Sequence, residues 1–328
     1  MTTGLWAAVS GLPPAAVVAA IPPACRRALD PATAWIEDDA VILEGPAWPA
    51  DGATHFVPAF SALTDAPFSV RFELSARAHG AWSPWVASVG LGSAPFTPLA
   101  DAPPLGVDVD VFRASAPIEA VRLRARVLAP SPAAIVGAPW LLTLSAADSA
   151  HPAPPAAAGV ARLAVPALSQ METDTAIARR ICSPACVAMV LDFWRRPVPV
   201  AALAAEMFHP GTDLYGVWPA AVLAAGRRGI AGYLLRFPDW SAAAWCLEQG
   251  LPVIASIRYA AGELTNAAIP ETSGHLIVLT GIDGASALVN DPAAPTSATV
   301  PRRYTIPELS HIWLDRTGVG YVLFPPRR

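Results

Sequence analysis

Cys182 lies where the sequence predicts the start of a helix. The residues from Ala185 to Trp194 are apolar and helix-prone, and Pro184 suits a first helical turn because its missing N–H would have no partner there. A thiol at a helix N-terminus is stabilised as the thiolate by the helix dipole and the free N–H groups. Cys182 is therefore a candidate nucleophile, and a buried structural cysteine is the alternative that this stretch alone leaves open.

A thiol nucleophile needs a base, and the base needs a group that fixes its tautomer. His275 opens a predicted strand, and Asp291 follows the next predicted strand. The Asp283-Gly284 pair between them predicts a tight hairpin turn, which would bring Asp291 close to His275. Asn290 is an alternative orienting residue, but neighbours in a strand point to opposite faces, so only one of the two can serve.

The hydrophobic pattern of the sequence changes after residue 160, in the part of the chain that holds these residues. Helical stretches come first after residue 160, and strand-like runs follow, which is typical of an α+β domain. The predicted helices are 184–194, 200–207, 218–226 and 241–249. The predicted strands are 252–259, 275–281, 287–290 and 320–324.

The first half of the chain reads as strands separated by turns. Residues 70–77 and 121–127 alternate apolar and polar side chains, which predicts half-buried strands and favours a β-sandwich. Further predicted strands are 40–43, 55–60, 85–89, 107–112 and 140–144. The pair Trp82 and Trp85 could contact a glycan, although aromatic residues at strand ends more often pack in a core.

Length and composition set the broad class. A chain of 328 residues exceeds what one core usually holds, so we expect two domains, 1–150 and 161–328, joined by a Pro- and Ala-rich linker over 148–160. The mean hydropathy is +0.42, but 36 prolines interrupt the apolar runs, and none reaches the length of a membrane span. A net charge of −4 argues against nucleic acid as the main partner. No positive charge precedes Arg26, so no signal peptide is recognised and a cytoplasmic location is expected.

The order Gln170, Cys182, His275 and Asp291 resembles the C39-type cysteine peptidases of the papain-like superfamily, particularly stand-alone bacterial C39-like proteins with an N-terminal β-rich region. The resemblance covers residues 160–328. Its most specific blocks are 165–170, 182–194, 216–219, 251–259, 273–276 and 290–293.

The resemblance implies a role for each of four residues. Cys182 would be the nucleophile, His275 the general base and later acid, and Asp291 the group that orients the imidazole. Gln170 matches the residue whose side-chain amide would line the oxyanion hole together with the backbone N–H of Cys182. Without the resemblance, Gln170 would count as an ordinary surface glutamine.

The other cysteines carry less chemistry. Cys186 lies one helical turn from Cys182, where we expect a small polar residue, and packing is preferred over a redox role for it. Cys25 and Cys246 are interpreted as buried or incidental. The four cysteines lack the spacing of metal ligands, so we expect neither a metal nor another cofactor.

These observations predict a thiol-dependent hydrolase of a peptide or related amide bond, with a peptide or protein as substrate. Two rivals remain open at this stage. One is a catalytically silent module that holds a peptide in the same cleft, and the other is an acyl transferase that uses the same thiol. The N-terminal domain could contact a glycan or another protein.

Overall fold

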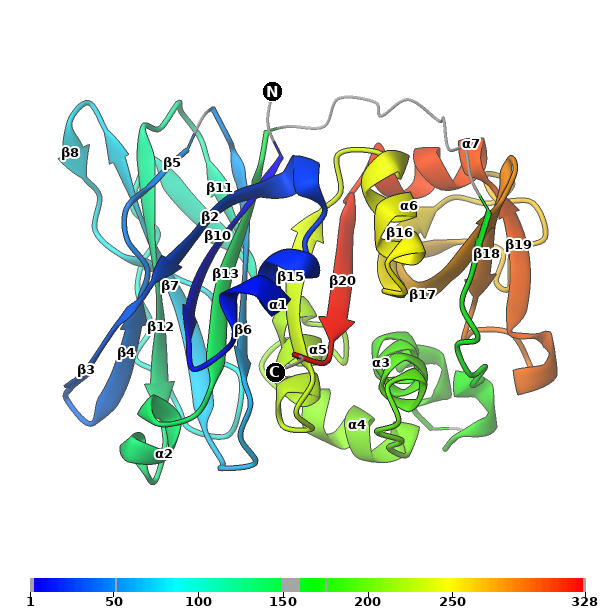
Figure 1. Ribbon diagram of the computed structural model, residues 1–328, viewed down its shortest axis with the longest axis horizontal. Helices are drawn as coiled ribbons and strands as arrows, with labels where there is room; N and C mark the ends of the chain where they lie inside the picture. Colours follow the sequence, from blue (N-terminus) through cyan, green and yellow to red (C-terminus); the bar gives the residue numbers. More distant parts are fainter. Residues whose placement is uncertain (1–2, 51, 149–159, 175, 327–328) are drawn as a thin grey trace.

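A computed structural model describes residues 3–50, 52–148, 160–174 and 176–326 of the chain (Figure 1). Two β-sheets occupy the N-terminal part, and a third sheet with helices occupies the C-terminal part. Most of the predicted linker 148–160 lies outside the described residues, and the division into two domains stays a prediction. No helix within the described residues is both long and apolar enough to cross a membrane.

The first sheet has the strand order β10-β11-β6-β13-β1-β2 and faces the C-terminal part of the chain. Its neighbours run antiparallel except β1 and β2, which are parallel. The strands are β1 (Gly4–Ser10), β2 (Arg26–Pro31), β6 (His55–Ala62), β10 (Leu105–Asp108), β11 (Val111–Ala114) and β13 (Trp140–Ala147).

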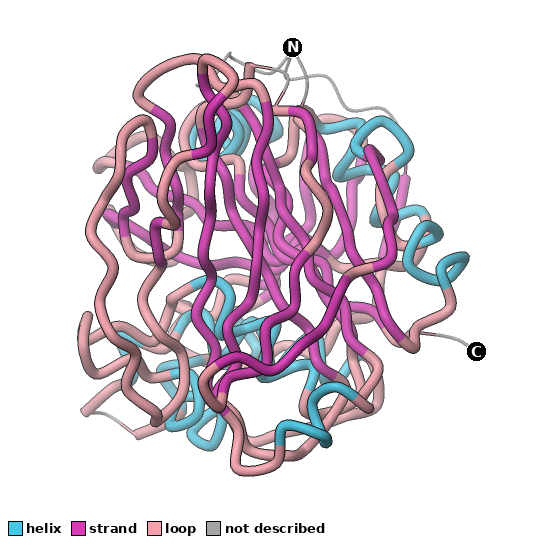
Figure 2. The backbone as a smooth tube through the Cα atoms, turned by 90° about the vertical axis from the view of Figure 1, so that its left-hand side faces the viewer, coloured by secondary structure: helices cyan, strands magenta, loops and turns pink. Residues whose placement is uncertain are grey.

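The second sheet has the order β3-β4-β12-β7-β8 and covers the first on its outer side (Figure 2). Apolar residues of both sheets meet in a shared core, where Phe60 of the first sheet belongs to the same buried cluster as Phe72 and Leu123 of the second. The strands are β3 (Thr33–Glu37), β4 (Ala40–Glu44), β5 (Trp48–Pro49), β7 (Ser69–Ala78), β8 (Ala81–Trp82), β9 (Val86–Ala87) and β12 (Ala120–Leu128).

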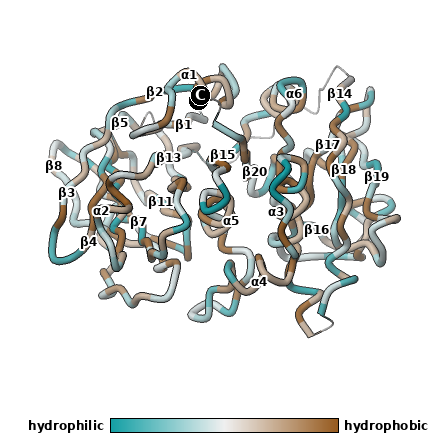
Figure 3. The backbone as a smooth tube through the Cα atoms, turned by 60° about the horizontal axis from the view of Figure 1, so that its bottom comes forward, coloured by the Kyte–Doolittle hydropathy of each residue, from teal (hydrophilic) through white to brown (hydrophobic). Residues whose placement is uncertain are grey.

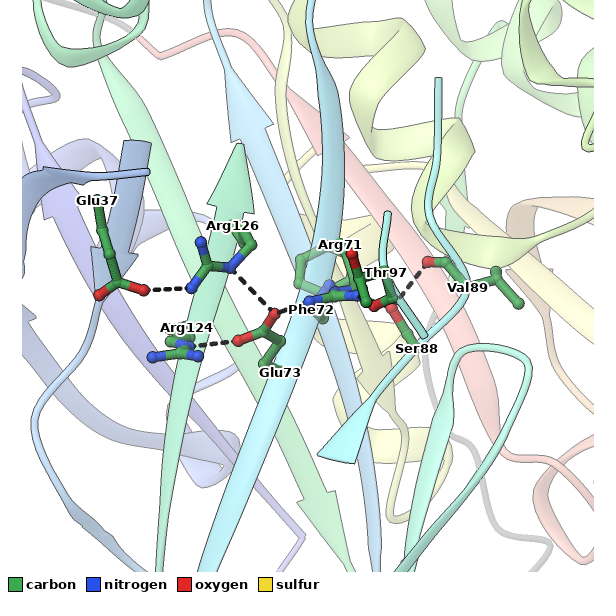
Figure 4. A network of polar contacts seen from close by, with 9 residues as sticks. All are labelled: Glu37, Arg71, Phe72, Glu73, Ser88, Val89, Thr97, Arg124 and Arg126. Atoms are coloured by element: carbon green, nitrogen blue, oxygen red, sulfur yellow. Dashed lines mark hydrogen bonds and ion pairs between the residues drawn. The ribbon is translucent and has the colours of Figure 1, made fainter. Parts of the chain in front are cut away.

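Arginine side chains surround the buried carboxylate of Glu73 in the second sheet (Figure 4). Glu73 accepts hydrogen bonds from Arg71 and Arg124, and the Nε of Arg126 lies 3.3 Å from it. Arg126 also pairs with Glu37 at 2.5 Å. A buried carboxylate is tolerated only when it is paired, so this cluster satisfies Glu73.

The two tryptophans considered for glycan contact stack against arginine side chains. The guanidinium of Arg122 lies 4.2 Å from the ring centre of Trp82, and that of Arg124 lies 4.2 Å from Trp85. Such stacks are a common way to cover indole rings on a sheet surface. A glycan or protein contact through this part of the chain stays a prediction.

The third sheet has the order β15-β20-β16-β17-β18-β19, with β14 paired to β17. Its strands are β14 (Val160–Arg162), β15 (Ala231–Arg236), β16 (Val253–Tyr259), β17 (Thr272–Asp283), β18 (Ser286–Asn290), β19 (Pro301–Thr305) and β20 (Val319–Phe324). The helices are α3 (Cys182–Phe193), α4 (Val200–Met207), α5 (Trp218–Gly226), α6 (Trp240–Glu248) and α7 (Ile306–Leu309). The predicted helices of this part are therefore confirmed to within two residues at each end, and its α+β character is observed.

Helix α5 lies between the first sheet and α3 (Figure 3). The closest approach is at Gly226, where a Cβ would lie only 2.6 Å from the backbone oxygen of Ala62 in β6. A second contact joins β15 to the N-terminal part of the chain. The hydroxyl of Tyr233 donates a hydrogen bond to the Ala20 oxygen at 2.6 Å, next to helix α1 (Pro14–Ala19). The N-terminal sheets and the C-terminal part thus share apolar cores.

The predicted strand 107–112 is wrong. The chain reverses at Val109 and Asp110, so that β10 and β11 form a hairpin. Val109 has a φ of +58°, a left-handed conformation that is rare for a β-branched residue. The turn places Asp110 against α5, where its Oδ2 accepts a hydrogen bond from the Trp218 N–H at 2.7 Å. Of the predicted strand 85–89, only Val86–Ala87 forms a strand.

Candidate active site

Cys182 is the first residue of helix α3, as the sequence predicts. Pro184 occupies the first turn, and the Ala185 N–H bonds the carbonyl of Ile181 at 3.0 Å, which closes that turn. The thiol is half-buried, whereas the helix residues from Ser183 to Leu191 are buried. The sulfur therefore lies beside the positive end of the helix with some access from solvent.

The imidazole of His275, near the start of β17, lies against this thiol. Burial raises the pKa of the Cys182 thiol, but the hydrogen bond and charge of His275, with the backbone N–H groups of Leu276 and Ser183, outweigh it, so that the pKa is lowered. A lowered thiol pKa makes Cys182 a thiolate at a lower pH than an ordinary cysteine.

Asp291, immediately after β18, fixes the other side of the imidazole. The Nε2 of His275 lies 2.8 Å from Oδ1 of Asp291, and both side chains are buried. Burial lowers the pKa of His275, but the charge and hydrogen bond of Asp291 and the contact with Cys182 raise it to about 10. Both shifts favour a thiolate beside an imidazolium at neutral pH.

The contact with Asp291 also sets which nitrogen faces the thiol. Because Nε2 donates to the carboxylate, the remaining nitrogen, Nδ1, is the one available to exchange a proton with Cys182. The β17–β18 hairpin that brings the two residues together has the predicted Asp283-Gly284 turn, with Gly284 at a φ of +61°.

Two further groups hold Asp291 in place. Its Oδ2 accepts a hydrogen bond from the Tyr304 hydroxyl at 2.7 Å, and its Oδ1 accepts one from the Ala293 N–H at 3.0 Å. Burial raises the pKa of the Asp291 carboxyl, but His275 and these donors lower it overall. The carboxylate is therefore ionised and fixed in orientation.

Asn290 does not orient the imidazole. Its side-chain amide donates to the carbonyl oxygens of Val165 and Pro166, both at 3.1 Å. It anchors the segment that leads to Gln170, on the opposite side of the strand from Asp291.

Gln170 is buried beside the segment that follows Asp291. Its backbone N–H bonds the Pro292 oxygen at 2.9 Å, and its Nε2 donates to the Ala178 oxygen at 2.7 Å. Its Oε1 has no hydrogen-bond partner among the described residues. An amide nitrogen has two N–H groups, so one remains for another acceptor.

The remaining cysteines are free thiols with no exposed surface. Cys186 is fully buried, and its Sγ donates to the Leu276 oxygen at 3.2 Å. Burial raises its pKa well above the ordinary value, which makes it a poor nucleophile. Cys25 and Cys246 are also buried, and burial raises the pKa of each. The arrangement agrees with packing as the role of Cys186.

Sequence reasoning missed Tyr304 and Asp110. Tyr304 lies on β19, a strand that carries no motif and was not predicted. Asp110 was placed inside a predicted strand, and no nearby residue signals that it binds the N-terminus of α5. Burial raises the pKa of Asp110 to about 7 even though it accepts the hydrogen bond from Trp218. The contacts of Tyr304 with Asp291 and of Asp110 with Trp218 both join segments that are distant in the sequence or belong to different strands.

No curated protein matches the sequence of this chain. The solved structures that are similar to this chain include three with TM-scores below 0.5. One is a double glycine motif protease from an AMS/PCAT transporter in complex with the leader peptide, with 21% identity, a TM-score of 0.34, and coverage of 50% of this chain and 94% of that one.

The second is the peptidase domain of Streptococcus ComA, described as a bifunctional ABC transporter involved in quorum sensing, with 17% identity, a TM-score of 0.36, and coverage of 49% and 98%. The third is a protein from Bacillus anthracis described as a C39-like peptidase, with 16% identity, a TM-score of 0.39, and coverage of 52% and 99%. The model of the Peptidase_C39 like family matches residues 162–321, the part of the chain that holds all four candidate residues. This match identifies residues 162–321 as a region of the Peptidase_C39 like family.

Proposed function

We propose that the chain is a cysteine peptidase with a papain-like C-terminal domain that hydrolyses a peptide or related amide bond. The observation that carries the proposal is the position of the His275 imidazole between the Cys182 thiol and the Asp291 carboxylate. The match of residues 162–321 to the C39-like family supports the same reaction class.

The first half of the reaction forms an acyl-enzyme. The Cys182 thiolate attacks the carbonyl carbon of the scissile amide, which forms the C–S bond and places a negative charge on the oxygen. The imidazolium of His275 then gives its proton to the leaving amine as the C–N bond breaks. Asp291 keeps the imidazole oriented and stabilises its charge throughout.

The second half releases the product. His275 takes a proton from water, and the hydroxide oxygen attacks the thioester carbon. The C–S bond breaks, the carboxylic acid leaves, and the thiolate–imidazolium pair is restored. In both halves, the free N–H of the Gln170 amide and the Cys182 backbone N–H would bind the negative oxygen.

The test is cleavage of a peptide library, read by mass spectrometry, with Cys182→Ala as the inactive form. We expect turnover to fall by about 10⁴-fold or more, because the attacking group is lost. Cys246→Ala, which removes a buried thiol from α6, is the matched control and should retain turnover.

Turnover that survives in Cys182→Ala would overturn the proposal. A wild-type chain that binds peptides while Cys182 resists alkylation would instead be a silent binding module. Peptide–amine adducts formed when an amine acceptor is added would indicate an acyl transferase.

A further inference from the structure

A small cavity lies between the first sheet and the C-terminal part of the chain. Its volume is about 150 Å³. That is well above the roughly 10–15 Å³ that one water needs, so the cavity has room for a carboxylate group. His55 and Arg113 line it from β6 and β11, and Arg236 and Arg258 line it from β15 and β16. The cavity therefore depends on both parts of the chain.

The lining residues carry positive charge and include no carboxylate. Arg113, Arg236, Arg258 and Arg316 contribute guanidinium groups to the wall. Arg316 is neutralised by Glu263, with two contacts of 2.7 Å. The three other arginines therefore give the cavity its charge.

These three arginines are weakly compensated. Arg113 lies 3.5 Å from Asp108, and both side chains of that pair are more than half exposed, so solvent screens it. Arg236 and Arg258 make no ion pair within the part of the chain that the structure describes, although the charge of Asp148 reaches Arg236. Burial lowers the pKa of Arg236 more than Asp148 raises it.

The imidazole of His55 lies within the electric field of two of these arginines. Burial lowers the pKa of its imidazole, and the charges of Arg236 and Arg113 lower it further, against a smaller opposing effect of Asp148. A neutral histidine can donate one N–H to an anion without adding to the charge.

Hydrogen bonds fix the wall of the cavity. The backbone N–H of Arg236 bonds the Ser145 hydroxyl at 2.9 Å, which joins β15 to β13. Arg316 donates to the Arg258 carbonyl at 2.6 Å. A Cβ at Gly318 would lie 3.0 Å from Cγ of Arg236, so the stem of this side chain is packed against the backbone. These contacts fix the backbone at Arg236 and Arg258 and the stem of the Arg236 side chain.

Two lining residues of the cavity lie close in sequence to residues that contact the candidate catalytic segments. Arg258 follows Ile257, the residue of β16 that pairs with His275. Trp218 lines the cavity, and Gly216 before it would place a Cβ 3.9 Å from that of Ser183, the neighbour of Cys182. These contacts connect the wall of the cavity to the residues next to His275 and Cys182.

We propose that Arg113, Arg236 and Arg258 form a subsite for a carboxylate of the peptide substrate, either an acidic side chain or the C-terminal carboxylate. Guanidinium groups bind carboxylates through paired N–H donors. Arg236 is half-buried, which strengthens its contact, whereas Arg113 and Arg258 are exposed and add charge at the rim. The inference rests on the proposed peptidase function and names the substrate class that the site selects.

The experiment compares kcat/KM for peptide pairs that differ only in Glu against Gln, or in a C-terminal acid against its amide. Wild type should prefer the acidic member of at least one pair by about tenfold or more, as expected for a charged hydrogen bond. The pair that shows the preference identifies the source of the carboxylate. In Arg236→Gln, the preference should fall close to one.

Arg196→Gln is the matched control, because this arginine is exposed beyond the C-terminal end of α3 and, among the described residues, its side chain bonds only the Arg195 oxygen. It should keep the wild-type preference. An unchanged alkylation rate of Cys182 verifies that Arg236→Gln is folded, and if that variant unfolds, Arg113→Gln on the opposite wall gives the same test. A wild type without preference, or a preference that survives in the pocket variants, would overturn the subsite.

Failure of the peptidase function gives a different result. If wild type cleaves no peptide, inorganic phosphate at constant ionic strength serves as the probe. A rise in Tm with phosphate that Arg236→Gln lacks would support an anion site, and equal behaviour of the two proteins would reject it.

Discussion

At the scale of residues, the candidate chemistry depends on one imidazole with a different partner at each nitrogen. Asp291 accepts the hydrogen bond from Nε2 of His275, so Nδ1 of the same ring faces Cys182. Tyr304 and Ala293 keep the carboxylate from turning away. The thiol alone would be a poor nucleophile, because burial by itself raises its pKa.

The effect of His275 on the thiol can be measured without a substrate. In His275→Ala, the burial that raises the Cys182 pKa remains, while the hydrogen bond and charge that lower it are lost. Iodoacetamide should therefore modify Cys182 at least roughly tenfold more slowly at pH 7, since one pKa unit changes the thiolate fraction tenfold. The rate should recover as the pH rises above 9.

His209→Ala is the control for this experiment, because His209 bonds Thr212 in a loop and does not contact the thiol. Mass spectrometry identifies which cysteine is modified. An alkylation rate that does not differ between His275→Ala and wild type would mean that the two side chains are not coupled.

At the scale of elements, the hairpin of β10 and β11 holds the helix that lies next to α3. Asp110 accepts the N–H of Trp218, the first residue of α5, and so satisfies a donor that the helix leaves unpaired. This contact is unusual because the carboxylate comes from a distant part of the sequence and is buried. Burial raises its pKa from 3.8 to about 7.

The raised pKa predicts how stability depends on pH. The folded chain holds a proton on Asp110 more tightly than the unfolded chain does, so this group stabilises the fold fully below pH 3.8. That contribution is lost as the pH rises through about 7. Asp110→Asn keeps an oxygen for the Trp218 N–H but cannot ionise. Its free energy of unfolding should exceed that of wild type by on the order of 1–4 kcal/mol at pH 8.

Urea unfolding at several pH values measures this difference, which should shrink toward zero at pH 4. Asp108→Asn, two residues earlier and mostly exposed, is the matched control and should follow the wild-type profile. Parallel pH profiles for Asp110→Asn and wild type would show that Asp110 is ionised freely in the folded chain.

At the scale of the whole molecule, the sequence predicts elements better than their pairing. The period-two pattern of β12 and the helices from α3 to α6 are confirmed because each depends on local residues. The hairpin of β17 and β18 was predictable from its Asp-Gly turn. The roles assigned to Cys182, His275, Asp291 and Gln170 stay predictions, although the first three side chains lie together.

What the sequence could not predict depends on long-range register. The contact of Tyr304 with Asp291 requires β19 to pair with β18. The turn at Val109 and Asp110 is explained by the hydrogen bond of Asp110 with α5. A β-branched residue with positive φ is not expected from local preference. In the same way, the cavity between the two parts of the chain draws its arginines from strands separated by more than a hundred residues.

The contact between the first sheet and α5 predicts that both parts of the chain unfold together. Gly226 is the position that tests it, because an added Cβ would lie 2.6 Å from a backbone oxygen of β6 that cannot move aside cheaply. We expect Gly226→Ala to push α5 away from the sheet and to lower the free energy of unfolding by about 1–3 kcal/mol. In a helix that is otherwise free, the same change would stabilise the chain.

Gly106→Ala in β10 is the control, since its Cβ would meet its nearest atom at an ordinary 3.5 Å. If the shared cores couple the two parts of the chain, calorimetry of Gly226→Ala should show a single transition at a lower Tm than wild type. A variant that is more stable than wild type would contradict this coupling through α5 and β6. So would two separate transitions of which one keeps the wild-type Tm.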